Sequence, residues 1–96
     1  MTGAITIDTG PEACCLAIMS TEPRWQFTNA SSGWVRVNVF DHERRVEASS
    51  GYRIAAGQSL IISSARPIDA QAFLSTQSID GQQGPVYAQP YNPEEI

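Results

Sequence analysis

The side chains that most often carry chemistry are few in this sequence. Its only histidine, His42, lies between Asp41 and Glu43 in the segment DHERR, where it could act as a general base or a metal ligand. A zinc site usually needs four ligands, however, and the only two cysteines lie far from His42 in the chain. We therefore expect no metal site, and we expect His42 to be a solvated turn residue.

The two cysteines, Cys14 and Cys15, are adjacent. Neighbouring residues on a β-strand point to opposite faces, so a disulfide between these two would need strained geometry. A reactive pair or redox switch is the alternative. The apolar run ACCLAIM around them instead favours two small hydrophobic side chains filling a strand.

The remaining polar residues do not assemble an enzyme motif. Asp41, Glu43 and Glu47 lie beside arginines, which should lower their pKa values, whereas a hydrolase needs one carboxyl whose pKa is raised. The sequence contains no glycine-rich phosphate loop and no nucleophile elbow. Asn29 opens a formal glycosylation sequon, which we expect to be accidental because no secretion signal is recognisable. The sequence predicts no catalytic residue, no cofactor and no enzymatic activity.

Length and charge narrow the function further. Ninety-six residues with 42% hydrophobic residues are typical of one soluble domain, and no apolar run is long enough to cross a membrane. The net charge is −4, yet residues 33–66 hold five arginines against three acidic residues, a local charge of +2 between acidic flanks. This distribution argues against nucleic-acid binding, which requires a basic patch without acidic neighbours. With no secretory signal at Met1, we expect the chain to be made and used in the cytosol.

The pattern of apolar residues predicts short β-strands. Residues 24–29 and 34–40 alternate apolar and polar side chains, and residues 13–19 form an unbroken apolar run that suits a central strand covered on both faces. The polar tetrapeptide 41–44 predicts a hairpin connection, after which RVEA (45–48) returns as a strand. Further strands are expected at 4–8, 52–54, 59–63 and 66–77.

Seven or eight short strands without a helical period indicate an all-β fold. We predict a small antiparallel β-sandwich or a jelly-roll or Ig-like barrel over residues 1–76. Residues 77–96 differ in composition, because they hold three prolines, two glycines and few aliphatic residues. Proline cannot donate within a sheet, so we predict an extended Pro/Gln-rich C-terminal arm that is either disordered or ordered on a neighbouring subunit.

Two segments carry the candidate interface. One face of residues 34–40 mixes aromatic and hydrogen-bonding side chains, a composition seen where a sheet meets a partner, and the arginines that follow could pair with acidic neighbours. The arm adds aromatic and apolar anchors. The predicted interface residues are Trp34, Arg36, Phe40, Arg44, Arg45, Val86, Tyr87 and Tyr91.

Residues 34–76 resemble small structural proteins of phages and gene-transfer agents, of the spike-base or head-decoration type. In these proteins a hairpin is followed by an "aG-x-x-l-x-i" strand and then by a strand of small residues. The matching positions here are Val35, Val37 and Val39, then Ala56, Gly57, Leu60 and Ile62, then Ala70, Ala72 and Leu74. The sequence departs from the pattern by lacking a Gly/Thr-rich segment after the last strand.

The resemblance implies a virion or capsid protein that is assembled in a bacterial cytoplasm. It would act as a structural oligomer, bound to copies of itself and to neighbouring capsid proteins. The alternative is a β-sandwich recognition module that binds carbohydrate or peptide, for which Trp25, Trp34 and Tyr52 could form a stacking platform.

Overall fold

The computed structural model describes residues 4–91, and these residues form eight short β-strands separated by turns. The strands are β1 (Ile5–Thr9), β2 (Cys14–Ile18), β3 (Arg24–Asn29), β4 (Val35–Phe40), β5 (Tyr52–Ile54), β6 (Ser59–Ser63), β7 (Ala72–Ser78) and β8 (Gly84–Pro90).

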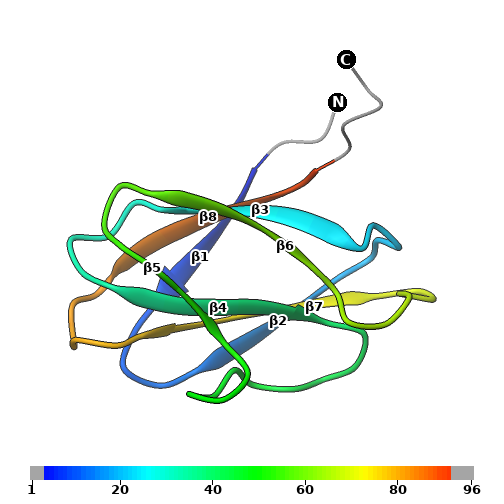
Figure 1. The fold of residues 1–96 in the computed structure, drawn as a ribbon, viewed down its shortest axis with the longest axis horizontal. Coiled ribbons are helices and arrows are strands. Elements are labelled where there is room, and N and C mark those ends of the chain that lie inside the picture. Colours follow the sequence, from blue (N-terminus) through cyan, green and yellow to red (C-terminus); the bar gives the residue numbers. More distant parts are fainter. Residues whose placement is uncertain (1–3, 92–96) are drawn as a thin grey trace.

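The strands form two antiparallel sheets of four strands each. Sheet A has the order β1-β8-β3-β6 and sheet B the order β2-β7-β4-β5. The two sheets lie over one another in two layers (Figure 1). The prediction of an all-β antiparallel sandwich is confirmed.

The core lies between the sheets and follows from the alternation in each strand. Trp25 and Phe27 of β3 face Val35, Val37 and Val39 of β4, and all five side chains are almost completely buried. Fully burying such a side chain contributes roughly 1.5–3 kcal/mol, so these five side chains make a large contribution to stability. The alternation predicted for residues 24–29 and 34–40 is therefore confirmed, with Trp25, Phe27 and the three valines on the buried faces.

The arm predicted for residues 77–96 is wrong over residues 77–90. Residues 77 and 78 complete β7, and β8 lies between β1 and β3 in sheet A, with Val86 and Ala88 in the core. Two prolines are compatible with this central strand because Pro85 and Pro90 lie near its ends. Residues 92–96 lie outside the described part of the chain.

Two further strands differ from the prediction. β2 lies at the edge of sheet B and pairs with β7 alone, so the apolar run 13–19 is not a central strand. Cys14 and Cys15 are free thiols there, opposite Thr76 and Ser75 and so on opposite faces of the sheet. Residues 66–71 precede β7 and are not part of it.

The hairpin connection after β4 is longer than predicted. It spans residues 41–51 and includes the segment 45–48, and β5 has only three residues. The connection folds over the outer face of sheet B, where Val46 is buried and its backbone N–H donates to Ser75 Oγ at 2.8 Å. The buried hydroxyl of Ser75 thus gains a partner that a tight four-residue turn could not have supplied.

A buried amide holds the turn after β3 to the rest of the fold. Asn29 is fully buried, and its Nδ2 donates to the carbonyl oxygens of Gly33 (2.7 Å) and Ile54 (2.9 Å). Its Oδ1 accepts bonds from the backbone N–H and the hydroxyl of Ser31, at 3.0 and 2.6 Å. A side chain so enclosed is inaccessible to a glycosylating enzyme in the folded domain, so the sequon has no role in this structure.

Candidate functional site

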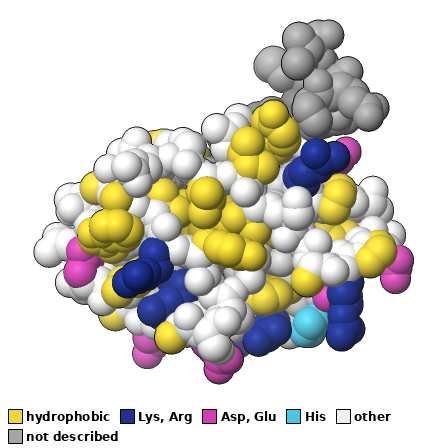
Figure 2. Space-filling view, in the orientation of Figure 1, with side chains coloured by type: hydrophobic (Ala, Val, Ile, Leu, Met, Phe, Trp, Pro, Cys, Tyr) yellow, Lys and Arg dark blue, Asp and Glu magenta, His cyan; other side chains and the backbone are white. Residues whose placement is uncertain are grey.

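One candidate site is an exposed patch on the outer face of sheet B, at the end where β4 begins. We call it the arginine–tryptophan patch and define it as Trp34, Arg36, Arg53 and Ile79. Trp34 is 49% exposed and Ile79 36% exposed, and the backbone N–H of Ile79 donates to the Trp34 carbonyl at 3.0 Å. Trp34, Arg53 and Ile79 line a hollow of about 300 Å³. Figure 2 shows arginine side chains next to exposed hydrophobic ones over the region of β4 and β5.

The two arginines of the patch carry charge that the described residues do not neutralise. Arg36 and Arg53 are directly opposite each other on β4 and β5. Arg36 Nη1 donates to the uncharged Gln77 at 2.9 Å, and no arginine within residues 4–91 forms an ion pair with a carboxylate. Like charges directly opposite one another destabilise a sheet, so the pair costs stability unless a partner supplies acidic groups.

Asp80 also lines the hollow, but its carboxylate is occupied by backbone groups. Asp80 Oδ2 accepts a bond from the N–H of Trp34 at 3.0 Å, and Oδ1 accepts one from the N–H of Gln82 at 3.2 Å. These bonds stabilise the ionised form and lower the pKa of Asp80. Asp80 therefore fixes the backbone position of Trp34 and leaves the arginines without a salt bridge.

The second candidate site is a cleft at the other end of β4. It has a volume of about 470 Å³ and lies between the end of β4, the 41–51 connection and the residues that follow β6. A volume of this size is typical of sites for small ligands. Its lining includes the side chains of Asp41, His42, Arg44, Tyr52 and Arg66.

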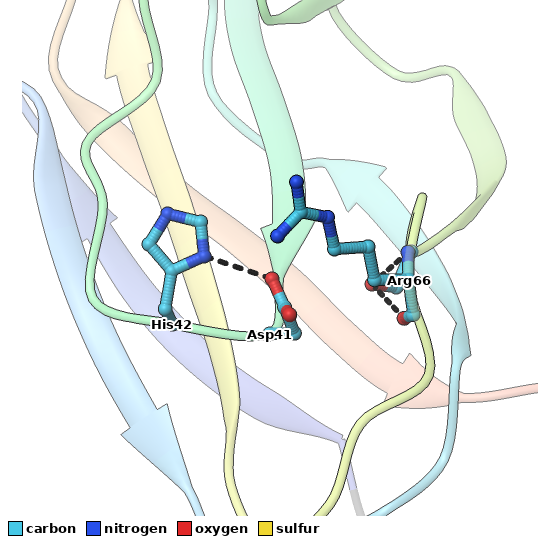
Figure 3. Close-up of polar contacts among 4 residues, drawn as sticks. Asp41, His42 and Arg66 are labelled. Carbon is cyan, nitrogen blue, oxygen red and sulfur yellow. Dashed lines mark hydrogen bonds and ion pairs between the residues drawn. The ribbon is translucent and has the colours of Figure 1, made fainter.

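The cleft contains a hydrogen-bonded pair with an arginine facing it. His42 Nδ1 lies 2.8 Å from Asp41 Oδ1. Figure 3 shows the Asp41 carboxylate between the His42 ring and the side chain of Arg66. The bond with His42, and to a smaller extent the charges of His42 and Arg66, lower the pKa of Asp41. The lowered pKa expected from neighbouring arginines thus holds for Asp41, but the histidine is the main cause.

Arg44 borders the same cleft. Its guanidinium carbon lies 5.0 Å from the centre of the Phe40 ring, within the range of a cation–π contact. Phe40 itself is only 7% exposed and forms part of the cleft lining. The contact holds the charge of Arg44 at the surface of the cleft that Arg66 also lines.

The cleft geometry is suited to binding. In the described part of the chain, His42 makes no hydrogen bond to a serine or cysteine, so the cleft lacks a nucleophile–base pair. No three His, Cys, Asp or Glu side chains between residues 4 and 91 lie close enough together to hold a metal ion. The guanidinium groups of Arg44 and Arg66 also line the cleft, and they can donate hydrogen bonds and attract an anion.

The predicted interface residues do not form one surface. Trp34 and Arg36 lie in the patch, whereas Phe40 and Arg44 lie at the cleft and Arg45 is exposed on the connection. Val86 is fully buried between the sheets because β8 is a core strand, so its assignment to an interface is wrong.

The other two predicted residues lie in sheet A. Tyr87 is 40% exposed on the outer face of sheet A, on the far side of the sandwich from the patch. Tyr91 follows β8, and its N–H donates to the Arg24 carbonyl at 2.9 Å. The predicted stacking platform is not formed either, because Trp25 is fully buried while Trp34 and Tyr52 line different hollows.

Arg53, Ile79 and Arg66 are the site residues that the sequence did not single out. The charge imbalance of residues 33–66 marked Arg53 and Arg66 as a group, but only the β4–β5 register places Arg53 opposite Arg36. A sequence pattern that predicts residues 45–48 as the returning strand cannot give this register. Ile79 was missed because residues 77–96 were interpreted as an arm.

Comparison of the chain with protein-family models, with curated proteins and with solved structures finds no significant match. The resemblance to phage structural proteins thus remains a prediction from the sequence. Over residues 4–91, no helix is long and apolar enough to cross a membrane.

Proposed function

We propose that this chain is a non-enzymatic assembly subunit that binds protein partners through the arginine–tryptophan patch. The observation that carries the proposal is the pair Arg36 and Arg53, which lie side by side without a carboxylate partner next to the exposed ring of Trp34. Tryptophan and arginine are the residues most enriched among the energetic centres of protein interfaces.

The charge of the chain supports a second copy as one such partner. The net charge is −4, and seven of the ten acidic residues lie outside residues 33–66, the segment that holds Trp34, Arg36 and Arg53. A carboxylate placed between two guanidinium groups can accept bidentate bonds and relieve their repulsion. Many weak contacts of this kind add up in a symmetric assembly. The strand cadence of residues 34–76 supports a virion or capsid as the assembly.

Sedimentation velocity of the purified protein tests this function. We expect the wild-type chain to form oligomers that shift to monomer in Trp34→Ala and in Arg53→Glu. Tyr87→Ala is the matched control, because it removes an exposed aromatic side chain from the opposite face of the sandwich. A chain that stays monomeric at all concentrations and does not bind a capsid-like particle, or patch variants that assemble like the wild type, would contradict the proposal.

A second candidate function is a recognition module for a peptide or a sugar, and the cleft at Asp41, His42 and Arg66 favours it. This candidate expects a monomer whose ligand binding is lost on changing Tyr52 or Arg66. The assembly subunit instead depends on Trp34 and Arg53. The two sets of variants therefore distinguish the two functions.

A further inference from the structure

β6 lies at the edge of sheet A, where it pairs with β3 alone. The carbonyl of Gln58 and the N–H of Ser64, just outside β6, form hydrogen bonds with backbone groups at the two ends of β3, at 2.9 and 2.8 Å. Backbone bonds in an antiparallel pair recur at every second residue. Leu60 and Ile62, which lie between these two points at that spacing, therefore direct their N–H and carbonyl groups to β3.

The backbone groups of the alternate residues point away from β3, to the open edge. These residues are Ser59, Ile61 and Ser63, and no other strand within residues 4–91 pairs with them. Proteins usually protect such an edge with a charge, a proline or a very short strand. β5 has three residues and an arginine, and β1 contains Asp8, whereas β6 has five residues without a charge or a proline. The edge at β6 is therefore open to a further strand.

The side chains of β6 leave apolar surface at the same edge. Ile61 is on the outer face of sheet A, opposite Gln26, and is 45% exposed. Leu60 is on the inner face, opposite the buried Phe27, yet it is 37% exposed. Figure 2 shows hydrophobic side chains in the middle of the view, over the strand labelled β6 in Figure 1. A strand added here would bury aliphatic surface as well as backbone groups.

The order of the residues in β6 fits a second copy of the same strand. With Ile61 at a two-fold axis, Ser59 of each copy is opposite Ser63 of the other copy, so all three outward-pointing residues meet in bonded pairs. Each bonded pair exchanges two backbone hydrogen bonds, so three pairs give six. Leu60 of each copy is then opposite Ile62 of the other copy at the closer, non-bonded positions, where aliphatic side chains contact each other.

The charges near β6 are compatible with this register. β6 itself is uncharged, and the first charged residue after it is Arg66. In the register centred on Ile61, Arg66 is opposite position 56 of the other copy, which is an alanine. The two copies of Arg66 therefore lie at opposite ends of the pair, and no like charges are opposed.

β2 is the other uncharged edge strand, but it offers fewer backbone groups. The N–H of Ile79 donates to the Trp34 carbonyl, so the odd-numbered residues of β7 bond to β4 and the even-numbered ones to β2. Only Cys15 and Ala17 of β2 direct backbone groups outward. A self-pair of β2 would thus have two bonded pairs and not three, so β6 is the favoured edge.

We propose that β6 pairs antiparallel with β6 of a second copy around a two-fold axis at Ile61, which joins sheet A of the two copies into one continuous sheet. A contact of five residues from each chain is small, so the pair forms at high protein concentration or between neighbours in an assembly. At the dilutions used for sedimentation, the patch sets the oligomeric state. The inference goes beyond the proposed function, because β6 belongs to sheet A and the patch to the outer face of sheet B.

Disulfide trapping in a concentrated solution of the full-length chain tests the register. Cys14→Ser/Cys15→Ser is the background, because both native thiols are free. A Ser59→Cys chain is mixed with a Ser63→Cys chain and oxidised mildly. We expect a disulfide-linked heterodimer, because the Cα atoms of bonded partners lie about 5.5 Å apart, within disulfide range. Either variant alone should not crosslink, because its two cysteines are offset by four residues, or roughly 13 Å.

Ile61→Lys in both chains is the blocking variant. Its side chain is exposed in the monomer, so the fold is retained, but the pair would place two ammonium groups directly opposite each other at the axis. We expect the heterodimer to be lost. Tyr87→Lys is the matched control, because it adds the same charge at an exposed position of β8 in the same sheet, and it should leave the crosslinking unchanged.

The strand pair is overturned if the mixture crosslinks no faster than either cysteine variant alone, or if crosslinking survives Ile61→Lys. Arg53→Glu in both chains separates this inference from the proposed function. We expect the crosslinking to persist in Arg53→Glu, whatever that change does to assembly through the patch. Loss of crosslinking in Arg53→Glu would show that the patch, and not β6, holds the two copies together, and would also overturn the inference.

Discussion

Arg36 of β4 and Arg53 of β5 are directly opposite each other in an antiparallel pair, and the side chain of Arg36 turns to the uncharged Gln77. Two like charges in this relationship weaken a sheet, because their repulsion opposes the strand pairing. A fold selected for stability alone would place an acid at one of the two positions. The arrangement is thus consistent with a surface whose charges are satisfied by a partner.

This relationship predicts that Arg53→Glu stabilises the isolated domain while it weakens assembly. Replacing repulsion with an exposed ion pair should raise the free energy of unfolding by about 0.5 kcal/mol. Urea denaturation of the monomer measures the change, and Arg45→Glu, on the exposed connection, is the matched charge control. A loss of stability in Arg53→Glu would mean that Arg53 has a favourable contact in the monomer.

The sequence predicted the strands in which side chains alternate. Trp25 and Phe27 in one strand, and Val35, Val37 and Val39 in another, point inward as their period of two requires. These strands need no information beyond local pattern, since a sheet with one buried face selects such an alternation. The all-β class of the fold followed from the number of predicted strands and from the absence of a helical period.

The sequence did not predict which segments would be covered by distant ones. Pro85 and Pro90 suggested an arm, but they occupy the ends of β8, where a missing donor is tolerated. Val46 belongs to the predicted strand 45–48, yet in the structure it covers the buried hydroxyl of Ser75, which is 29 residues further along the chain. Such contacts depend on strand order, which single-sequence patterns do not specify.

The candidate sites show the same limit. Trp34, Arg36 and Arg44 were identified because their residue types suit interfaces, and all three have exposed or half-exposed side chains. Trp34 and Arg36 lie at the start of β4, whereas Arg44 follows its end. Residue type alone does not show that these two ends belong to different surfaces. The predicted docking face of residues 34–45 is therefore divided between the patch and the cleft.

Asn29→Ala should destabilise the domain strongly. The buried amide makes four hydrogen bonds, and its removal leaves the carbonyl of Ile54 and the groups of Ser31 without this partner. Each buried group left unsatisfied costs about 1–3 kcal/mol, so we expect a loss of about 3 kcal/mol or more. Thermal and urea unfolding measure it. Ser32→Ala, at the exposed neighbouring position, should change the free energy of unfolding little.

Gly84→Ala should also destabilise the fold, for a steric reason. A Cβ at position 84 would lie 2.6 Å from Ser31 Cβ and 2.8 Å from Ser31 Cα, and the backbone of Ser31 is held by Asn29. Overpacking of this kind typically costs about 1–3 kcal/mol. Gly10→Ala is the control, because a Cβ there has no atom within 4 Å. Equal stabilities of the two variants would show that the 31–33 turn can move away from β8.

Asp80 should make stability depend on pH at the acidic end. Its carboxylate accepts backbone N–H bonds from Trp34 and Gln82, which lowers its pKa in the folded state below that of the unfolded chain. A lowered folded-state pKa gives a stabilising contribution that is complete above the unfolded pKa of about 3.9 and is lost as the pH falls below it. Asp80→Asn should therefore flatten the fall in unfolding free energy below about pH 4, with little change in that slope near pH 7.

Glu12→Gln, an exposed carboxylate elsewhere, controls for net charge. If the acid limb of the stability profile is the same in Asp80→Asn and in the wild type, the carboxylate does not hold the Trp34 backbone in solution.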